Sequence, residues 1–232
     1  MKTITRRTAL QWLNSLLVVL AFPFTVCKTA IAERFPTRTV EKANFSFDPS
    51  SGMIRWTGTG KEEPYALVVG GLVAKPITLT YRQLRALPSA SQVSDFHCVE
   101  GWTLPHVKWS GFRFNEIVDQ VKPLPEARYV IFHSLGETTY RPQGQKHYLE
   151  SFETASLVDP KQEILMALDK DGKPLSRDRG APLRVVAPYR FAYKSIKFVH
   201  RVEFAKKKRL GWWTLADPVY DWRAYVYGGS GR

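Results

Sequence analysis

One cysteine of the chain lies where it could do chemistry. Cys98 stands in residues 95–102 (DFHCVEGW), where a predicted strand gives way to a turn that contains a glycine. Its thiolate could attack a substrate if a histidine base lay within hydrogen-bond reach, or it could be the single protein ligand of a metal held mainly by an organic cofactor. The neighbouring His97 would point to the opposite face of a strand, and no CxxC or HxxxH pair accompanies Cys98, so we do not expect a zinc site made of protein ligands alone. A buried, inert thiol is the third interpretation, and this segment leaves all three open.

Two basic segments could bind an anion. Residues 177–184 (RDRGAPLR) place three arginines around a glycine–proline turn, and the planar guanidinium of arginine fits a phosphate group. Residues 194–197 (KSIK) bring two lysines and a hydroxyl to the start of a predicted strand, where backbone N–H groups can also contact an anion. Each segment could equally be a solvated loop or an ordinary basic strand edge. The denser run at residues 206–209 (KKKR) is typical of a solvated face.

A cluster of aromatic residues lies near the end of the sequence. Its members are Trp212, Trp213, Tyr220, Trp222, Tyr225 and Tyr227. Such rings line cavities or cap cores, because they bury large apolar areas. Base stacking would need the same rings beside basic residues, but the export signal described below argues against a nucleic-acid partner.

The elements that must position these residues are mostly short strands. Apolar and β-branched residues predict strands at 65–71, 77–79, 93–99, 127–135, 164–168, 183–187 and 197–204. Helices are expected at 114–121, at 151–158 and at 80–87, where Thr80 and Gln83 have the spacing of a capping box. Strands outnumber helices and do not alternate regularly with them, so the sequence predicts an α+β fold. We expect an irregular leader at 33–64, one domain at 65–205 and an aromatic extension at 206–232 that packs on it.

The composition fits a single domain with an anionic ligand. The chain has 232 residues, with 34 Lys and Arg against 21 Asp and Glu, a formal charge of +13 and 44% hydrophobic residues. These values exclude a disordered tail, a collagen and a coiled coil, and they supply one well-cored domain rather than several. Two cysteines exclude a disulfide-dense scaffold and a cysteine-rich zinc or iron–sulfur site.

Residues 1–32 are predicted to be an export signal. A basic start precedes a mostly apolar run at 9–26 and a small-residue cleavage pattern at 30–32 (AIA). The pair Arg6-Arg7 resembles a twin-arginine export motif, which predicts a periplasmic location. Cleavage would discard Cys27 and leave Cys98 as the one thiol. The alternatives are an ordinary secretory signal and an uncleaved anchor, since the apolar run nearly spans a bilayer.

Taken together and in order, these segments resemble the oxidoreductase molybdopterin-binding domain of the sulfite-oxidase superfamily. The likeness runs from about Tyr65 to Tyr225 and is carried by residues 97–102 (HCVEGW), 109–112 (WSGF), 180–184 (GAPLR) and 194–197 (KSIK). Residues 213–218 (WTLADP) are also similar to the tail of the periplasmic protein-methionine-sulfoxide reductase catalytic subunit. The resemblance implies a single β-rich domain of the sulfite-oxidase type that holds a molybdenum–molybdopterin cofactor.

The resemblance also implies roles for individual residues. Cys98 would bind the molybdenum, whose other ligands are oxo groups and the dithiolene of molybdopterin. Contacts with the cofactor would fall on Ser134, Arg179, Arg184, Ser195, Ile196 and Lys197. Arg179 stands where the family commonly has Asn or His, yet an arginine can still contact a phosphate. A large dianionic cofactor does need basic and hydroxyl donors gathered from separate strands.

The function that the resemblance implies is oxygen-atom transfer at the molybdenum, in the direction that reduces an S- or N-oxide. Sulfite oxidases carry an arginine-rich segment straight after the cysteine, whereas residues 99–103 (VEGWT) hold no arginine. The cofactor segment with Asn and Tyr that precedes the domain in the methionine-sulfoxide reductase subunit is not found in residues 33–64. The alternatives are a sulfite dehydrogenase-like enzyme, a non-catalytic module that binds a cofactor or anion, and a thiol enzyme that uses Cys98 with a distant histidine.

The expected partners follow from the same interpretation. The substrate is a small-molecule or protein-bound oxide, and His133 with the aromatic cluster is expected to line its entrance. Electrons would come from or go to a separate haem- or quinone-linked protein, because the chain has no CxxCH haem site. We expect no nucleic-acid partner, and membrane contact only through an uncleaved signal.

Overall fold

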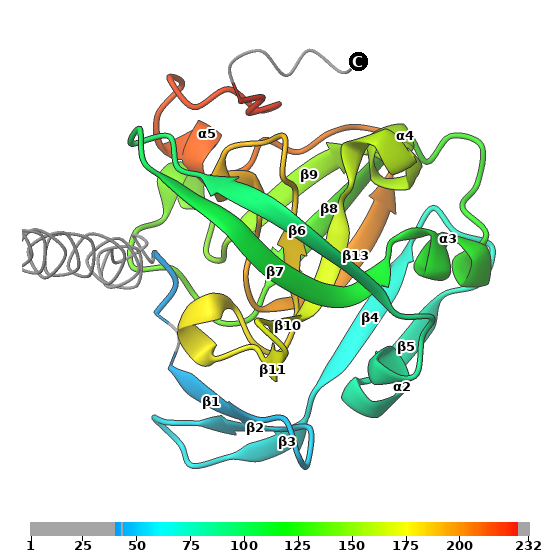
Figure 1. The fold of residues 1–232 in the computed structure, drawn as a ribbon, viewed down its shortest axis with the longest axis vertical. Helices are drawn as coiled ribbons and strands as arrows, with labels where there is room; N and C mark the ends of the chain where they lie inside the picture. The colour runs from blue at the N-terminus through cyan, green and yellow to red at the C-terminus, as the bar shows by residue number, and fades with distance from the viewer. Residues whose placement is uncertain (1–39, 43, 227–232) are drawn as a thin grey trace, which may run out of the picture. The chain divides into compact units, whose positions relative to one another are not determined.

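The computed structural model describes residues 40–42 and 44–226, which form the second of two units of the chain (Figure 1). The predicted export signal, the first part of the expected leader and Tyr227 lie outside these residues. No helix in the described part has the length and apolar character needed to cross a membrane.

A three-stranded antiparallel sheet opens the described part, in the order β1 (Phe45–Asp48), β2 (Met53–Trp56) and β3 (Glu62–Pro64). The expectation of irregular structure at 33–64 is therefore wrong for these residues. Most of the side chains here are at least partly exposed, but Phe45 and Ile54 are buried in the main core. Short strands with so few apolar positions give a weak periodic signal, and their tertiary contacts hold them in place.

The second sheet carries the segment with Cys98. Its strands run in the order β11 (Lys173–Pro174), β10 (Leu165–Lys170), β7 (Thr103–Arg113) and β6 (Ala90–His97), and β12 (Arg184–Val186) pairs with β10. The sequence did not predict β7, although it is the longest strand described. Pro105, His106 and Gly111 interrupt its pattern, whereas pairing with β6 and β10 on its two sides stabilises it.

The third sheet has the order β5 (Ile77–Thr80), β4 (Ala66–Gly71), β13 (Val199–Ala205), β8 (Tyr129–Ser134) and β9 (Leu149–Glu153). The pair β4–β13 is parallel and its other pairs are antiparallel. Residues 151–153 belong to β9, so the helix expected at 151–158 is wrong over these positions. Ser151 is fully buried in this strand, which a surface helix would not require.

Short helices connect the strands. They are α2 (Tyr81–Arg85), α3 (Asn115–Val121), α4 (Thr154–Val158) and α5 (Trp212–Ala216), with 3-10 turns at Pro142–Gly144, Pro160–Gln162, Arg177–Arg179 and Ala192–Lys194. The capping box is confirmed, because the Thr80 hydroxyl accepts from the Gln83 N–H and the Gln83 side chain accepts from the Thr80 N–H.

The main core joins residues of the second and third sheets, including Phe112 of β7, Phe132 of β8 and Phe204 of β13. In β10, Met166 and Leu168 pack in this core, whereas Leu165 and Ala167 pack in a second cluster on the opposite face of the strand. Burial of both faces explains the continuous apolar run at 164–168. The predicted α+β class, rich in sheet, is confirmed.

Gly111 tests the packing of the second sheet. It lies opposite Ala90 on one side and Ala167 on the other, and a Cβ at this position would come within 2.0 Å of the Met166 carbonyl oxygen. We predict that Gly111→Ala lowers the free energy of unfolding by roughly 2–3 kcal/mol, because backbone atoms must separate to admit the methyl group. Urea denaturation followed by circular dichroism measures it.

Gly70→Ala is the matched control in β4, because a Cβ there meets nothing within 4 Å. Its free energy of unfolding should stay within about 0.5 kcal/mol of that of the wild type. Equal effects of the two substitutions would refute this account of the β7–β10 contact.

Candidate functional site

Cys98 follows the last residue of β6 and begins a tight turn. The Cys98 N–H donates to the Trp102 carbonyl at 2.9 Å, and the Gly101 N–H donates to the Cys98 carbonyl at 3.1 Å. Gly101 has a φ of 88°, a value that a residue with a side chain rarely adopts. The thiol is half-buried rather than enclosed in either core cluster. The turn therefore presents the sulfur at the margin of the second sheet.

Arg184 joins the two basic segments that the sequence analysis identified. Its buried guanidinium donates from Nη1 to the Arg179 carbonyl at 3.1 Å and from Nη2 to the Ser195 carbonyl at 2.9 Å. It also lies 5.0 Å from the ring centres of both Phe96 and Trp109. Phe96 is two residues before Cys98, so Arg184 also connects the basic segments to the strand that ends at the thiol.

The cations of this region repel one another. Burial, together with the charge of Arg179, lowers the pKa of Arg184 to about 9. Burial likewise lowers the pKa of Lys197, and the charges of Arg184 and Arg179 act in the same direction. Glu41 is buried and raises the pKa of both Arg184 and Lys197. Arg179, Arg184 and Lys197 thus form a group of neighbouring cations, which Glu41 and, at Lys197, Asp178 offset in part, and such a group favours an anionic ligand.

The backbone around Lys197 allows this close approach. Gly180 has a φ of 104°, and a Cβ there would lie 2.9 Å from Lys197 Cγ and 3.2 Å from Arg184 Cβ. The Ser195 hydroxyl accepts from the Ala187 N–H at 3.1 Å. Ile196 packs its side chain in the main core, and its backbone is engaged as well, because its N–H donates to the Lys194 carbonyl and its carbonyl accepts from the Val185 N–H, each at 2.9 Å.

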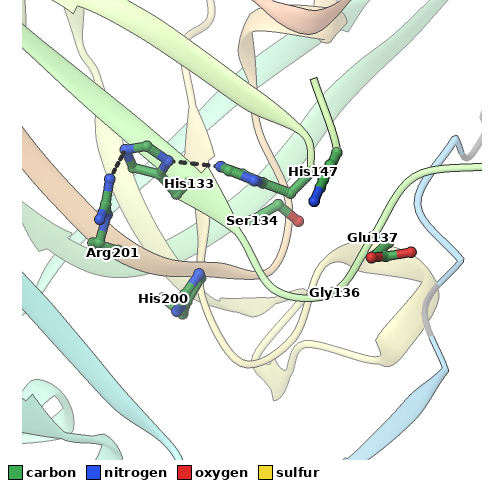
Figure 2. A pocket seen from close by; sticks show the side chains of 8 residues that line it. His133, Ser134, Gly136, Glu137, His147, His200 and Arg201 are labelled. Atoms are coloured by element: carbon green, nitrogen blue, oxygen red, sulfur yellow. Dashed lines mark hydrogen bonds between the residues drawn. The ribbon is translucent and has the colours of Figure 1, made fainter. Parts of the chain in front are cut away.

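Ser134 lies apart from the cations, at the end of β8 opposite Val199 of β13. Its hydroxyl donates to the Leu135 carbonyl at 3.3 Å, and the Leu135 N–H donates to the Phe198 carbonyl. It lines a pocket of about 340 Å³ together with His133, Gly136, Glu137, Lys146, His147, His200 and Arg201 (Figure 2). The structure thus brings together Arg179, Arg184, Ser195, Ile196 and Lys197, with Ser134 near the strand that follows Lys197.

The sequence gives His133 a place at the substrate entrance, and it offers His147 and His200 only as bases that the fold could bring to Cys98, without predicting that the three lie together. His133 Nδ1 lies 2.8 Å from His147 Nε2, and His133 Nε2 lies 3.0 Å from Arg201 Nη2 (Figure 2). Burial lowers the pKa of His133 to about 3 and that of His200 to about 4, and the nearby arginine charges add to both effects. His147 and His200 come from a loop and a neighbouring strand, so only the pairing of β8 with β13 reveals the cluster.

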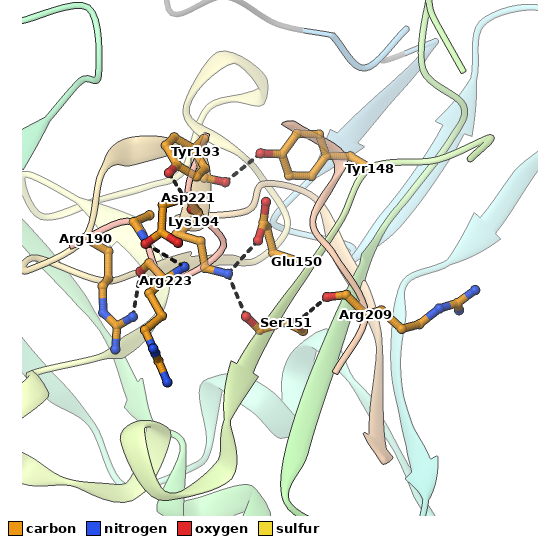
Figure 3. Close-up of polar contacts among 10 residues, drawn as sticks. Tyr148, Glu150, Ser151, Arg190, Tyr193, Lys194, Arg209, Asp221 and Arg223 are labelled. Carbon is orange, nitrogen blue, oxygen red and sulfur yellow. Dashed lines mark hydrogen bonds and ion pairs between the residues drawn. The ribbon is translucent and has the colours of Figure 1, made fainter. Parts of the chain in front are cut away.

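A second polar network lies next to the triplet Ser195, Ile196 and Lys197, which we call the cofactor triplet after its expected role (Figure 3). Lys194 Nζ pairs with Glu150 Oε2 at 2.7 Å and donates to the Ser151 carbonyl at 2.6 Å, and both side chains are almost fully buried. The Ser151 hydroxyl donates to the carbonyl of Arg209, which leads into α5. This network holds Lys194, the residue before Ser195, in place. It also anchors the C-terminal aromatic segment, whose Trp212 packs in the main core.

The donors present fit an anionic organic cofactor. Trp109 Nε1 is buried and has no hydrogen-bond partner among the described residues, although its ring lies beside the Arg184 guanidinium. An unpaired donor beside three cations is what a ligand rich in acceptor oxygens would complete. The described residues contain no group of three or more histidine, cysteine or acidic side chains that could hold a metal by itself. A metal here would need further ligands from the cofactor.

Comparisons with known proteins agree with this geometry. The family described as "Oxidoreductase molybdopterin binding domain" matches residues 50–213. Among solved structures, the sulfane dehydrogenase SoxCD from Paracoccus pantotrophus has a similar fold, with a TM-score of 0.53 and 17% sequence identity. The match covers 75% of this chain and 50% of that chain, so the present chain corresponds to about half of the longer protein. The family domain binds molybdenum–molybdopterin, which confirms the predicted cofactor. By its sequence match, its fold and its gathered cations, the chain belongs to the oxidoreductase molybdopterin-binding domain family.

Proposed function

We propose that the chain is an exported enzyme that transfers an oxygen atom at a molybdenum centre ligated by Cys98. The proposal rests on the position of the half-buried Cys98 thiol. Phe96, two residues earlier, packs its ring on Arg184, and Arg184 belongs to a cluster of cations. A thiol that was merely structural would not need cations from two further segments beside its strand. The family match supports a molybdopterin oxidoreductase, and the oxygen-atom transfer is our inference.

Each part of the site has a task in this proposal. Bound molybdenum–molybdopterin supplies a metal that exchanges an oxygen atom with two electrons. Cys98 provides the protein thiolate, while Arg179, Arg184 and Lys197 offset the negative charge of the cofactor phosphate. The Ser134 hydroxyl adds a neutral donor from the third sheet. Arg184 also excludes water, because its guanidinium is buried between Phe96 and Trp109.

We favour reduction of an S- or N-oxide, in which the substrate oxygen, two electrons and two protons leave as water. The lack of arginine in residues 99–103 supports this direction, since a sulfite site would need cations close to the metal ligand. The second candidate is a sulfite dehydrogenase-like oxidation, which the fold shared with a sulfane dehydrogenase favours. The similarity to the methionine-sulfoxide reductase subunit stays a prediction. A separate haem- or quinone-linked protein would carry the electrons in either direction.

Export to the periplasm is part of the same proposal and rests on residues 1–32. Their twin-arginine-like start suits a route that carries folded proteins with the cofactor already inserted.

We assign Lys194 and Glu150 the task of positioning the cofactor triplet. Their ion pair is buried on both sides, and Gly211 lies so close to the Glu150 carboxylate that a Cβ there would approach Oε1 to 2.1 Å. The pair therefore holds the loop before Ser195 from one side and the start of α5 from the other.

The Cys98 assignment is tested by metal and pterin analysis of the full chain, isolated with its export route intact. We predict about one molybdenum and one pterin per wild-type chain, with reduction of an S- or N-oxide by a dye donor. Cys98→Ser should change the molybdenum absorption-edge spectrum through loss of one Mo–S bond and reduce turnover by at least about a hundredfold, because the hydroxyl is a poorer ligand for this metal. Val99→Ser, which alters the exposed neighbour in the same turn, is the control and should match the wild type.

Several results would contradict the assignment. A molybdenum spectrum unchanged in Cys98→Ser would exclude the thiolate ligand. Pterin without turnover would indicate a binding module, and rapid thiol labelling of a chain with neither metal nor pterin would indicate a thiol enzyme.

The positioning pair is tested by breaking and then removing it. Lys194→Met should lower the free energy of unfolding by roughly 3–5 kcal/mol, because Glu150 is left buried without its partner. Lys194→Met with Glu150→Gln should recover more than half of that loss, since no charge then remains buried. Urea denaturation measures stability, and pterin retained after gel filtration measures positioning. A single variant as stable as the wild type, with unchanged pterin, would refute this role.

A further inference from the structure

The proposed function uses only one residue of the pocket around His133 and His200, which is Ser134. Its shape depends on an irregularity in β13. The pairing of β13 with β8 shifts register between Val199 and Arg201, so His200 sits in a bulge. Adjacent strand residues normally face opposite sides, but the bulge allows both His200 and Arg201 to line the same pocket. Bulges that redirect a side chain in this way are typical of functional sites.

The hydrogen bonds of the pocket define which imidazole atoms carry protons. Arg201 Nη2 donates to Glu203 Oε2 at 2.7 Å and, with its other hydrogen, to His133 Nε2 at 3.0 Å. His133 Nε2 also lies 3.3 Å from Glu203 Oε2, but the shorter Arg201 contact favours the tautomer in which Nε2 accepts and Nδ1 donates to His147 Nε2. His147 therefore holds its own proton on Nδ1, which has no hydrogen-bond partner among the described residues.

His200 is a second open group. It is half-buried, it lines the pocket, and within the described part of the chain neither of its ring nitrogens has a hydrogen-bond partner. Two imidazoles with unused donors therefore face one pocket whose wall also includes the Ser134 hydroxyl.

The charges around the pocket make it attractive to an anion. Lys146 lines it and is exposed, and Arg201 and Arg209 both lower the pKa of His133 and of His147. The two acids nearby are already paired, Glu203 with Arg201 at 2.7 Å and Glu137 with Arg141 at 3.0 Å. Lys42 adds a further cation 3.6 Å from Glu137. Positive charge thus exceeds negative charge on the side of the pocket that is open to solvent.

The space suits a small ligand. A volume of about 340 Å³ compares with roughly 30 Å³ for one water in the liquid, so a small ion fits together with part of its hydration shell. A neutral apolar ligand would leave the imidazoles and cations without partners.

We propose that this pocket binds a free tetrahedral oxyanion of the sulfate or phosphate class through Arg201, Lys146 and the imidazoles of His147 and His200. Arg201 supplies the fixed charge, because its hydrogen bonds to His133 and Glu203 hold the guanidinium in place. The site is separate from the cations of Arg179, Arg184 and Lys197, and Ser134 is the residue through which the two regions meet. The proposal does not depend on the metal or on the direction of the reaction.

The test is titration of the cofactor-loaded full chain with sodium sulfate at low ionic strength, followed by calorimetry. We expect one sulfate per chain, with affinity at least about tenfold weaker in Arg201→Gln, since a charge-assisted hydrogen bond is lost. His200→Gln should weaken binding in the same way if Arg201→Gln folds poorly. Arg128→Gln is the matched control, because it also removes one positive charge but lies next to the opposite end of β8. It should bind sulfate with the affinity of the wild type.

Histidine ring spectra locate the ion. All five histidines are described, so sulfate should move the resonances of His147 and His200 and leave those of His97 and His106 in place. Affinity should rise as the pH falls below about 6, because burial lowers the pKa of His147 and lowers that of His200 to about 4, so both imidazoles are neutral near pH 7 and gain charge only in acid.

Three results would overturn the proposal. The first is an equal sulfate affinity in Arg201→Gln, His200→Gln and the wild type. The second is a shift of ring resonances that is confined to His97 and His106. The third is sulfate binding that is seen only in cofactor-free protein. The last result would assign the pocket to the cofactor's own phosphate. None of them bears on the molybdenum and pterin content, so failure here is distinct from failure of the proposed function.

Discussion

The buried guanidinium of Arg184 is the contact on which the site depends. It is the common partner of the turn at Arg179, the loop at Ser195 and the rings of Phe96 and Trp109. Each of these comes from a different part of the chain, and their meeting places the basic segments beside the strand that leads to Cys98. Burial makes this charge costly, which the lowered pKa reflects, and Glu41, two backbone carbonyls and two ring faces compensate it in part.

The cost of burying a charge also distinguishes two polar pairs near the site, Lys194 with Glu150 and Arg201 with Glu203. Lys194 and Glu150 are buried together and fully depend on each other, so they fix backbone rather than bind a ligand. Arg201 is about half exposed and shares its donors between an acid and an imidazole, so it can still meet an anion from solvent. Lys194 is thus closed to solvent by its own ion pair, whereas Arg201 still reaches solvent.

The sequence predicted the residue types of the site better than their arrangement. The ordered motifs singled out Cys98, Arg184 and the triplet at 195–197, because each lies in a short local pattern, and their roles stay predictions. The capping box at Thr80 was equally local and was correct. β7 and the leader strands were missed because their stability comes from partners distant in sequence, and Ser151 was assigned to a helix for the same reason. The histidine pocket arises from the β8–β13 register and its bulge, neither of which any short segment encodes.

If Arg184 arranges the site for the cofactor, the pterin content of Arg184→Lys must fall. Lysine keeps the charge but lacks the fork that reaches both the Arg179 and the Ser195 carbonyls. The account predicts a pterin-to-protein ratio well below that of the wild type in a chain that still folds, while Arg113→Lys, which changes a partly buried arginine at the end of β7, keeps the wild-type ratio. A full complement of pterin in Arg184→Lys would contradict the account.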